Sequence, residues 1–110
     1  MAGNFQRLLI SIIIPTYNRD QPLRDCLFLL FHQPYRNFEI IVIDQSDKDF
    51  PGKERFYKKY SSRLRLFRMK SPSIPRAINL GIKRAKGEIV LMIDDDILAD
   101  KRLLVSHMEN

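Results

Sequence analysis

Three consecutive aspartates, Asp94, Asp95 and Asp96, follow the apolar run Ile89–Ile93 and are the residues best suited to chemistry. In an extended backbone, side chains two positions apart point the same way and lie roughly 7 Å apart. We therefore expect Asp94 and Asp96 to face one site and Asp95 to point away. Two carboxylates aimed together repel each other, and a hard divalent cation held by Asp96 and shared with a diphosphate would offset that repulsion. The alternative is an acidic turn in which one aspartate caps the next helix.

A fourth aspartate, Asp44, comes directly after a second apolar run, Phe38–Ile43. Its carboxylate could accept a hydrogen bond from a nucleobase N–H or from a ribose hydroxyl. The alternative is an Asx turn in which Asp44 bonds the backbone of Ser46.

A polar segment also follows the first apolar run of the chain and consists of Pro15, Thr16, Tyr17, Asn18 and Arg19. Tyr17 could lie against a base, Thr16 could bond that base, and Arg19 could meet a phosphate. The alternative is a simple turn formed by Asn18. Further along, Arg76 could pair with a diphosphate or with one of the aspartates, or it could be a solvated surface charge.

A basic stretch with interleaved aromatic residues lies in the middle of the chain. Its charged members are Lys53, Arg55, Lys58, Lys59 and Arg63. Such mixtures occur on proteins that bind nucleic acid or anionic lipid. We interpret this one as the solvated face of a surface helix, and we expect no nucleic-acid partner.

The composition is that of one small globular domain, with 110 residues, 45% of them hydrophobic and 29% charged. A formal net charge of +6 suits anionic partners without choosing among them. The lone Cys26 cannot form an internal disulfide, which favours a reducing cytosol, and we expect it to pack in the core. The sequence has no Gly-rich dinucleotide fingerprint, no P-loop and no Gly-x-Ser-x-Gly elbow, which argues against a dehydrogenase, an NTPase or a serine hydrolase.

Alternating strand and helix patterns position these residues. We expect strands at Leu8–Ile14, Phe38–Ile43, Leu64–Met69 and Ile89–Ile93, and helices at Asp20–His32, Lys53–Tyr60, Pro75–Ala85 and Lys101–Met108. Asp20 is expected to cap the first helix, and Gly87 to end the third.

This alternation predicts an α/β fold, a doubly wound and mostly parallel sheet with helices on both faces. The strand Leu64–Met69 alternates only partially and is expected nearer a sheet edge. Ligands of such sheets bind beyond the carboxyl ends of the strands, so the polar residues that follow the strands should converge on one crevice.

Four segments, in this order, resemble those of the family 2 glycosyltransferases, which have the Rossmann-like GT-A fold: Ser11–Arg19, Phe38–Ser46, Arg76–Gly81 and Gly87–Asp96. The last of them leads into a motif similar to the family's Asp-x-Asp. Each segment alone is a weak signal, whereas the ordered set is specific. One departure is Gln45, where many members carry a second aspartate.

The resemblance implies a metal-assisted, inverting transfer of a sugar to a hydroxyl acceptor, as in polysaccharide biosynthesis. The expected donor is a nucleotide-diphosphate sugar, a UDP-sugar in the first place, and the expected acceptor is a saccharide or a lipid-linked glycan. The resemblance implies that Thr16 and Asp44 contact the base, and that Arg76 lies near the base and the diphosphate. It also implies that Asp94 touches the ribose or the sugar, and that Asp96, with Asp94, binds Mn²⁺ or Mg²⁺. The remaining members of the expected nucleotide-sugar site are Pro15, Tyr17, Asn18, Arg19 and Asp95.

The family pattern further includes an acceptor-binding half with an acidic general base, which we expect downstream of Asn110. We therefore expect residues 1–110 to be the single nucleotide-sugar-binding half of a truncated GT-A domain, able to bind nucleotide but inactive alone. We expect it in the cytoplasm, or at the inner face of the membrane through regions outside this chain. The alternative is a non-catalytic nucleotide-binding or interaction module, complete at this length. A nucleotidyltransferase would need a Gly-rich loop after the first strand, and Pro15–Arg19 holds no glycine.

Overall fold

The computed structural model describes residues 8–48, 52–60 and 62–95. The strands in this part of the chain are β1 (Ile10–Thr16), β2 (Phe38–Asp44), β3 (Leu64–Arg68) and β4 (Ile89–Met92), and the helices are α2 (Asp20–Phe31), α3 (Lys53–Lys59) and α4 (Ile74–Arg84). Each of them confirms an expected element, with ends that differ by up to two residues. The expected helix Lys101–Met108 and the residue Asp96 lie outside the described residues.

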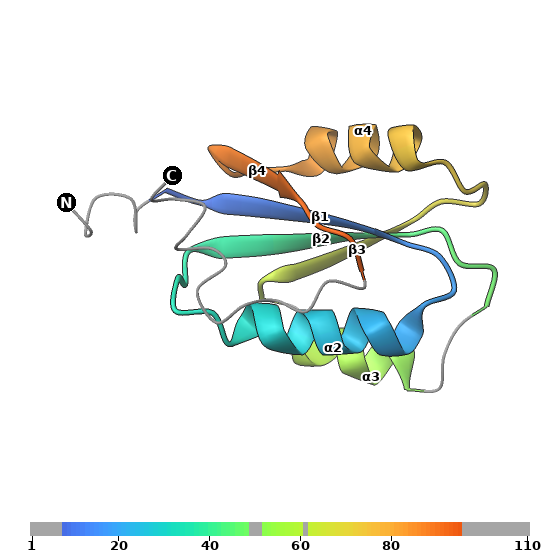
Figure 1. The fold of residues 1–110 in the computed structure, drawn as a ribbon, viewed down its shortest axis with the longest axis horizontal. Coiled ribbons are helices and arrows are strands. Elements are labelled where there is room, and N and C mark those ends of the chain that lie inside the picture. The colour runs from blue at the N-terminus through green and yellow to red at the C-terminus, as the bar shows by residue number, and fades with distance from the viewer. Residues whose placement is uncertain (1–7, 49–51, 61, 96–110) are drawn as a thin grey trace.

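The strands form one sheet in the order β3-β2-β1-β4, and every neighbouring pair is parallel. Helix α4 covers one face of the sheet, and α2 and α3 cover the other (Figure 1). The doubly wound α/β fold is thus confirmed, and β3 lies at a sheet edge as predicted. Because the strands are parallel, the carboxyl ends of β1, β2 and β4 lie at the same end of the sheet.

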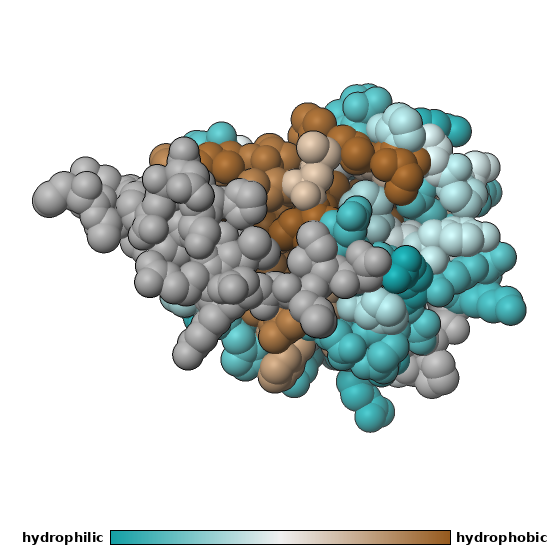
Figure 2. Space-filling view, viewed as in Figure 1, coloured by the Kyte–Doolittle hydropathy of each residue, from teal (hydrophilic) through white to brown (hydrophobic). Residues whose placement is uncertain are grey.

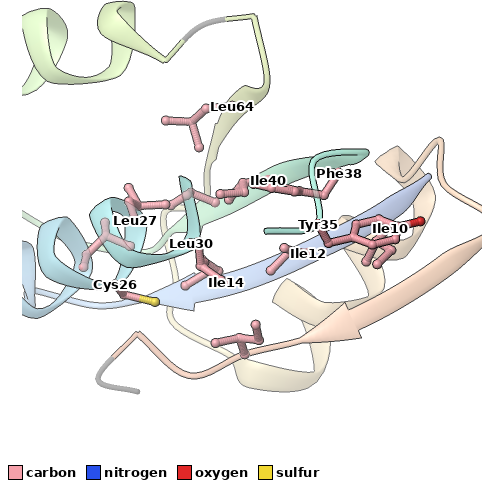
Figure 3. Close-up of a cluster of buried hydrophobic side chains, with 13 residues drawn as sticks. Ile10, Ile12, Ile14, Cys26, Leu27, Leu30, Tyr35, Phe38, Ile40 and Leu64 are labelled. Atoms are coloured by element: carbon pink, nitrogen blue, oxygen red, sulfur yellow. The ribbon is translucent and has the colours of Figure 1, made fainter. Parts of the chain in front are cut away.

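The larger core lies between the sheet and the helices α2 and α3 (Figure 3). Alternate residues of β1 and β2 point into it, because successive side chains of a strand face opposite sides of the sheet. They meet the apolar stripe of α2, and the buried members include Ile10, Ile12, Ile14, Leu23, Cys26, Leu27, Leu30, Phe38, Ile40 and Val42. The predicted core position of Cys26 is confirmed.

The second core lies under α4 and is formed by the intervening strand residues Ile13, Ile41 and Ile43 with Ala77. The helix approaches β1 closely because residue 81 is glycine. A Cβ added at Gly81 would lie only 2.5 Å from Cγ2 of Ile13. This close approach places the start of α4 beside the carboxyl end of β1.

The helix starts differ in detail from the prediction. Arg19, not Asp20, is the N-cap of α2, and it makes no side-chain capping bond. Asp20 is the first helical residue, where its negative charge still interacts favourably with the helix dipole. Helix α4 starts after Ser73, whose Oγ accepts a hydrogen bond of 3.4 Å from the backbone N–H of Arg76.

Gly87 has a role other than the predicted one. It does not end α4, because that helix ends at Arg84 with Ala85 as its cap. Instead, a Cβ at Gly87 would lie 2.6 Å from both the carbonyl oxygen of Leu9 and Oγ of Ser11. Glycine at this position therefore lets the chain entering β4 pass directly against β1.

A polar network ties the three strands β1, β2 and β3 to the segment that follows α4. Ser11 Oγ donates a hydrogen bond of 2.6 Å to Glu39, the backbone N–H of Lys86 donates one of 2.7 Å, and Arg65 donates one of 2.8 Å. Burial by itself would raise the pKa of Glu39, but these hydrogen bonds and the charge of Arg65 outweigh it and hold the pKa below its ordinary value. The carboxylate therefore stays ionised inside the fold.

Apolar side chains also reach the surface over α4 and β4, where Figure 2 shows an apolar strip. Its exposed members include Ile74, Ile82, Val90 and Met92.

In the part of the chain that the structure describes, no helix has the length and apolarity needed to cross a bilayer.

Candidate functional site

A pocket of about 420 Å³, the main pocket, opens at the carboxyl end of the sheet. Its walls come from the ends of β1 and β4, the residue after β2 and the first turns of α4. The lining residues are Pro15, Thr16, Tyr17, Arg19, Gln45, Ile74, Ile78, Met92, Ile93, Asp94 and Asp95. The expected convergence of the strand ends is therefore observed, and of the polar residues expected after β2, Gln45 lines the pocket and Asp44 does not.

Asp95 lies at the polar side of the main pocket. Thr16 Oγ1 donates a hydrogen bond of 2.8 Å to Asp95 Oδ2, and Arg19 Nε lies 3.4 Å from Asp95 Oδ1. The prediction that Asp95 points away from Asp94 is wrong, because both line the same pocket. The strand alternation on which it relied ends with β4 at Met92, two residues before the aspartates.

Asp94 is exposed and lines the main pocket. Within residues 8–48, 52–60 and 62–95, no three acidic, histidine or cysteine side chains form a group that could hold a metal, and Asp96 lies outside these ranges. Asp94 offers the oxygen ligands that Mn²⁺ and Mg²⁺ prefer, whereas Asp95 already faces Thr16 and Arg19. Asp94 is thus the one carboxylate among the described residues of the main pocket that is exposed and able to meet a cation.

Part of the lining of the main pocket is apolar. Ile74 and Ile78 lie one helical turn apart on α4, and Met92 ends β4. Tyr17, which is 45% exposed, adds an aromatic ring at the end of β1. A flat, partly apolar ring such as a nucleobase suits this side.

Gln45 is a pocket residue whose role we did not foresee. It is almost fully buried, and its Oε1 accepts a hydrogen bond of 2.6 Å from the backbone N–H of Ser73 just before α4. Because only the amide oxygen can accept, this bond fixes the orientation of the whole carboxamide. The signal was available in the sequence, since Gln45 is the first residue after a buried strand.

Lys53 is buried, and this is the largest difference between the structure and our expectations. We placed it on a solvated surface helix, but it is 8% exposed and forms an ion pair with Asp44, which is 3% exposed. Lys53 shares one face of α3 with the aromatic residues Phe56, Tyr57 and Tyr60, which pack against the larger core. That spacing of three, four and seven residues is the sequence signal that predicts its inward direction.

Asp44 is held by internal partners at both carboxylate oxygens. Lys53 Nζ donates to Oδ2, and the backbone N–H of Ser46 donates to Oδ1 at 2.9 Å. Burial by itself would raise the pKa of Asp44, but the hydrogen bonds from Lys53 and Ser46 outweigh it and hold the pKa below its ordinary value. The Asx turn with Ser46 that we left open is therefore present.

Asp44 and Asn18 line a second, smaller pocket of about 20 Å³, which shares Thr16 and Arg19 with the main pocket. It has room for about one water molecule. Arg76 is exposed on the first turn of α4 and lines neither pocket. Six of the expected residues thus gather in the main pocket, and they are Pro15, Thr16, Tyr17, Arg19, Asp94 and Asp95.

Residues 11–110 match the sequence profile of glycosyl transferase family 2. Over 93 residues the chain is 33% identical to an uncharacterized glycosyltransferase of Rickettsia conorii. The matched stretch covers 84% of this chain and 15% of that relative. The chain is also 36% identical over 103 residues to a poly(ribitol-phosphate) beta-glucosyltransferase of Bacillus spizizenii. This matched stretch covers 86% of this chain and 16% of that relative. The chain therefore spans about a sixth of the length of these two relatives.

Solved structures share the fold. TarS of S. aureus in complex with UDP superposes with a TM-score of 0.77 at 28% identity, over 93% of this chain and 31% of TarS. The mannosyltransferase PcManGT from Pyrobaculum calidifontis, in complex with GDP-Man and Mn²⁺, has a TM-score of 0.70 at 24% identity, over 84% of this chain and 29% of that protein, and at this identity it shows the fold alone. With the family profile matched over residues 11–110 and with this GT-A-like fold, the chain belongs to glycosyl transferase family 2.

Proposed function

We propose that this chain binds the nucleotide-diphosphate sugar from which a family 2 glycosyltransferase moves the sugar to a hydroxyl acceptor with inversion. The main pocket carries the proposal, because it joins an apolar side to a side with carboxylates and a guanidinium at the carboxyl ends of β1 and β4. Structures of TarS with UDP and with UDP-GlcNAc support a UDP-sugar as the donor. Those structures are 28% identical to this chain.

The nucleobase would lie on the apolar side, against Ile74, Ile78 and the ring of Tyr17. Stacking and burial of a flat ring would provide most of its binding energy there. Gln45 would face the edge of the base, with its amide group already oriented by the bond from Ser73. Preorganisation of this kind lowers the entropy that binding would otherwise cost.

The diphosphate would lie on the polar side, near Arg19 and Asp94. The guanidinium of Arg19 would bring positive charge, and its Nε lies 3.4 Å from Asp95 Oδ1. Asp94, and Asp96 as the family resemblance implies, would hold a Mn²⁺ or Mg²⁺ ion, whose positive charge would stabilise a leaving nucleoside diphosphate. Asp95, held by Thr16, serves to position this end of the pocket.

Attack by an acceptor hydroxyl needs a general base within hydrogen-bond distance of that hydroxyl. Asp95 is poorly suited, because Thr16 and Arg19 already engage its oxygens. We propose that residues outside this chain supply the base and the acceptor site, so that the chain alone binds nucleotide and transfers little or no sugar. The span of the chain, about a sixth of the Rickettsia conorii and Bacillus spizizenii relatives, supports this division. The cytoplasm, or the inner face of the membrane, is the compartment that we propose for the reaction.

Calorimetric titration of the purified chain with UDP, with and without Mn²⁺, tests the proposal. We expect metal-dependent binding that weakens about tenfold or more in Asp94→Asn and Asp96→Asn, because each change removes a charged ligand of a shared cation. Lys58→Met, at an exposed lysine of α3, is the control and should bind as the unchanged chain does. A chain shown to be folded by circular dichroism that binds neither UDP, GDP nor dTDP with any metal would contradict the proposal.

A further inference from the structure

We propose that Lys53 is a positioning residue for nucleotide binding, which acts on the main pocket through Asp44, Ser46 and Asn18. The inference rests on the proposed function, since it concerns the loop Tyr17–Arg19 beside that pocket. Lys53 itself does not line the main pocket. Its effect would have to pass through the contacts that connect it to this loop.

The first connection is the buried ion pair. The side chains of Lys53 and Asp44 are 9% and 4% exposed, and Nζ donates directly to Oδ2. A buried carboxylate without a cation must take up a proton or turn toward water, because an uncompensated charge is costly in a protein interior. Lys53 therefore determines both the charge and the direction of the Asp44 side chain.

The second connection joins β2 to the loop after β1. The backbone N–H of Ser46 donates to Asp44 Oδ1 at 2.9 Å, and Ser46 Oγ accepts a hydrogen bond of 2.7 Å from the backbone N–H of Asn18. Arg68 donates to the carbonyl oxygen of Ser46 at 3.1 Å and holds it from the side of β3. A movement of Asp44 would thus shift Ser46, and with it the Ser46 Oγ that accepts the hydrogen bond from the backbone N–H of Asn18.

The third connection is the backbone of Asn18. Its φ of 51° lies in the left-handed region, which costs energy in a residue other than glycine unless a contact stabilises it. Its neighbours Tyr17 and Arg19 both line the main pocket, and Arg19 also contacts Asp95. The bond from Asn18 to Ser46 therefore fixes the residues proposed to meet the base and the diphosphate.

Hydrogen exchange of backbone amides in the unliganded 110-residue chain tests the inference without any nucleotide. In Lys53→Met the Asn18 amide should exchange about tenfold faster, as expected when one hydrogen bond is lost, while the Ile13 amide in the central strand changes less. Lys58→Met is the matched control on the same helix and should leave Asn18 unchanged. No acceleration at Asn18 in Lys53→Met, or equal acceleration at Asn18 and Ile13, would overturn the inference.

Ser46→Ala covers the case in which Lys53→Met does not fold. This change removes the Oγ acceptor of Asn18 but leaves the ion pair of Lys53 and Asp44 in place. Its Asn18 amide should also exchange about tenfold faster. Unchanged exchange of the Asn18 amide would show that the hydrogen bond to Ser46 does not hold the loop Tyr17–Arg19, and would overturn the inference.

A double-mutant cycle on UDP affinity shows whether Lys53 acts through Ser46. We expect Lys53→Met and Ser46→Ala each to weaken binding about tenfold, and the double variant to bind no more weakly than Ser46→Ala alone. Lys53→Arg keeps the cation and should restore part of the affinity. Additive losses would mean that Lys53 acts by another route and would overturn the inference. If the unchanged chain does not bind UDP, the proposed function fails, and the exchange experiment still decides the role of Lys53.

Discussion

Asp44 and Asp95 are buried carboxylates, and their individual partners decide where they point. Asp95 is 6% exposed, and the hydroxyl of Thr16 and the guanidinium of Arg19 both face it. A carboxylate in such a position is costly unless hydrogen bonds compensate its lost hydration. Thr16 therefore fixes the turn that presents the neighbouring Asp94 to the pocket.

Replacing Thr16 by valine keeps the shape of the side chain but removes the hydroxyl that donates to Asp95. We expect the free energy of unfolding to fall by about 1–3 kcal/mol, because a buried acceptor loses its donor. Urea denaturation followed by circular dichroism measures this change. Thr16→Ser retains the hydroxyl, and its free energy of unfolding should fall clearly less than that of Thr16→Val. A valine variant as stable as the unchanged chain would show that the bond to Asp95 does not contribute.

At this scale, the residue types alone predicted part of the site. The rule that ligands bind beyond the carboxyl ends of parallel strands was sufficient to bring Thr16, Arg19 and Asp94 together. The rule did not distinguish Asp44 from Gln45, because a register of one residue decides which of them reaches the main pocket. The burial of Lys53 was missed because we followed the charge of the segment and not the helical spacing that places Lys53 on the same face as Phe56 and Tyr57.

Among the elements, the contact between α4 and β1 brings the two sides of the main pocket together. Gly81 permits this contact, since its missing side chain leaves room for Ile13. The helix carries Ile74 and Ile78 of the apolar side, while β1 ends in Thr16 on the polar side. The distance between these elements therefore determines the width of the pocket.

Gly81→Ala should destabilise the chain, although alanine is the better helix former. The added Cβ would lie 2.5 Å from Cγ2 of Ile13, whose side chain is fully buried and cannot move aside without shifting the helix. Overpacking of this kind costs about 1–3 kcal/mol and outweighs a helix-propensity gain of about 1 kcal/mol. Thermal unfolding measures the net effect of the overpacking cost and the helix-propensity gain. Asn79→Ala, at an exposed position of the same helix, should be neutral or slightly stabilising, and an equal effect of both changes would contradict the explanation.

The network around Glu39 should make stability depend on acid pH. Its pKa is lower in the folded chain than in the unfolded chain, where a glutamate has a pKa of about 4.3. The stabilisation is therefore fully present above that pH and is lost as the pH falls through the lower, folded pKa. Urea denaturation between pH 7 and pH 3 should show a shallower loss of stability in Glu39→Gln than in the unchanged chain. Identical pH profiles would show that Glu39 does not contribute this dependence.

Over the whole molecule, the type and order of the described elements followed from the sequence, because nearly continuous apolar strands alternated with amphipathic helices. The end of β1 did not. We expected the first strand to end at Ile14, yet β1 continues with Pro15 opposite Ile43 and Thr16 opposite Asp44. A proline removes only its own N–H from the ladder, and the neighbouring strands hold the rest of the backbone extended. This extension places Thr16 beside Asp95.

The charge of the whole chain should make nucleotide binding depend on salt. With a formal net charge of +6, the chain attracts a nucleoside diphosphate over distances beyond direct contact. We expect the dissociation constant for UDP to rise several-fold between about 50 mM and 500 mM sodium chloride, because salt screens that attraction. Titration at constant Mn²⁺ measures it, and uridine, which lacks the charge, should be much less affected. An affinity for UDP that does not change with salt would exclude a contribution from the overall charge.

The strand order has a consequence for how the chain acquires its binding site during synthesis. β1 emerges first and β4 last among the described strands, yet they are neighbours, and the bonded pair Thr16 and Asp95 is separated by 79 positions in the chain. Contacts between distant positions close late, since the entropy cost of the loop precedes any gain from the contact. The nascent polypeptide can assemble β1, β2 and β3 while β4 is still within the ribosome. The nucleotide affinity that we propose would arise only when β4 docks, so that the ligand stabilises the four-stranded sheet and none of its precursors.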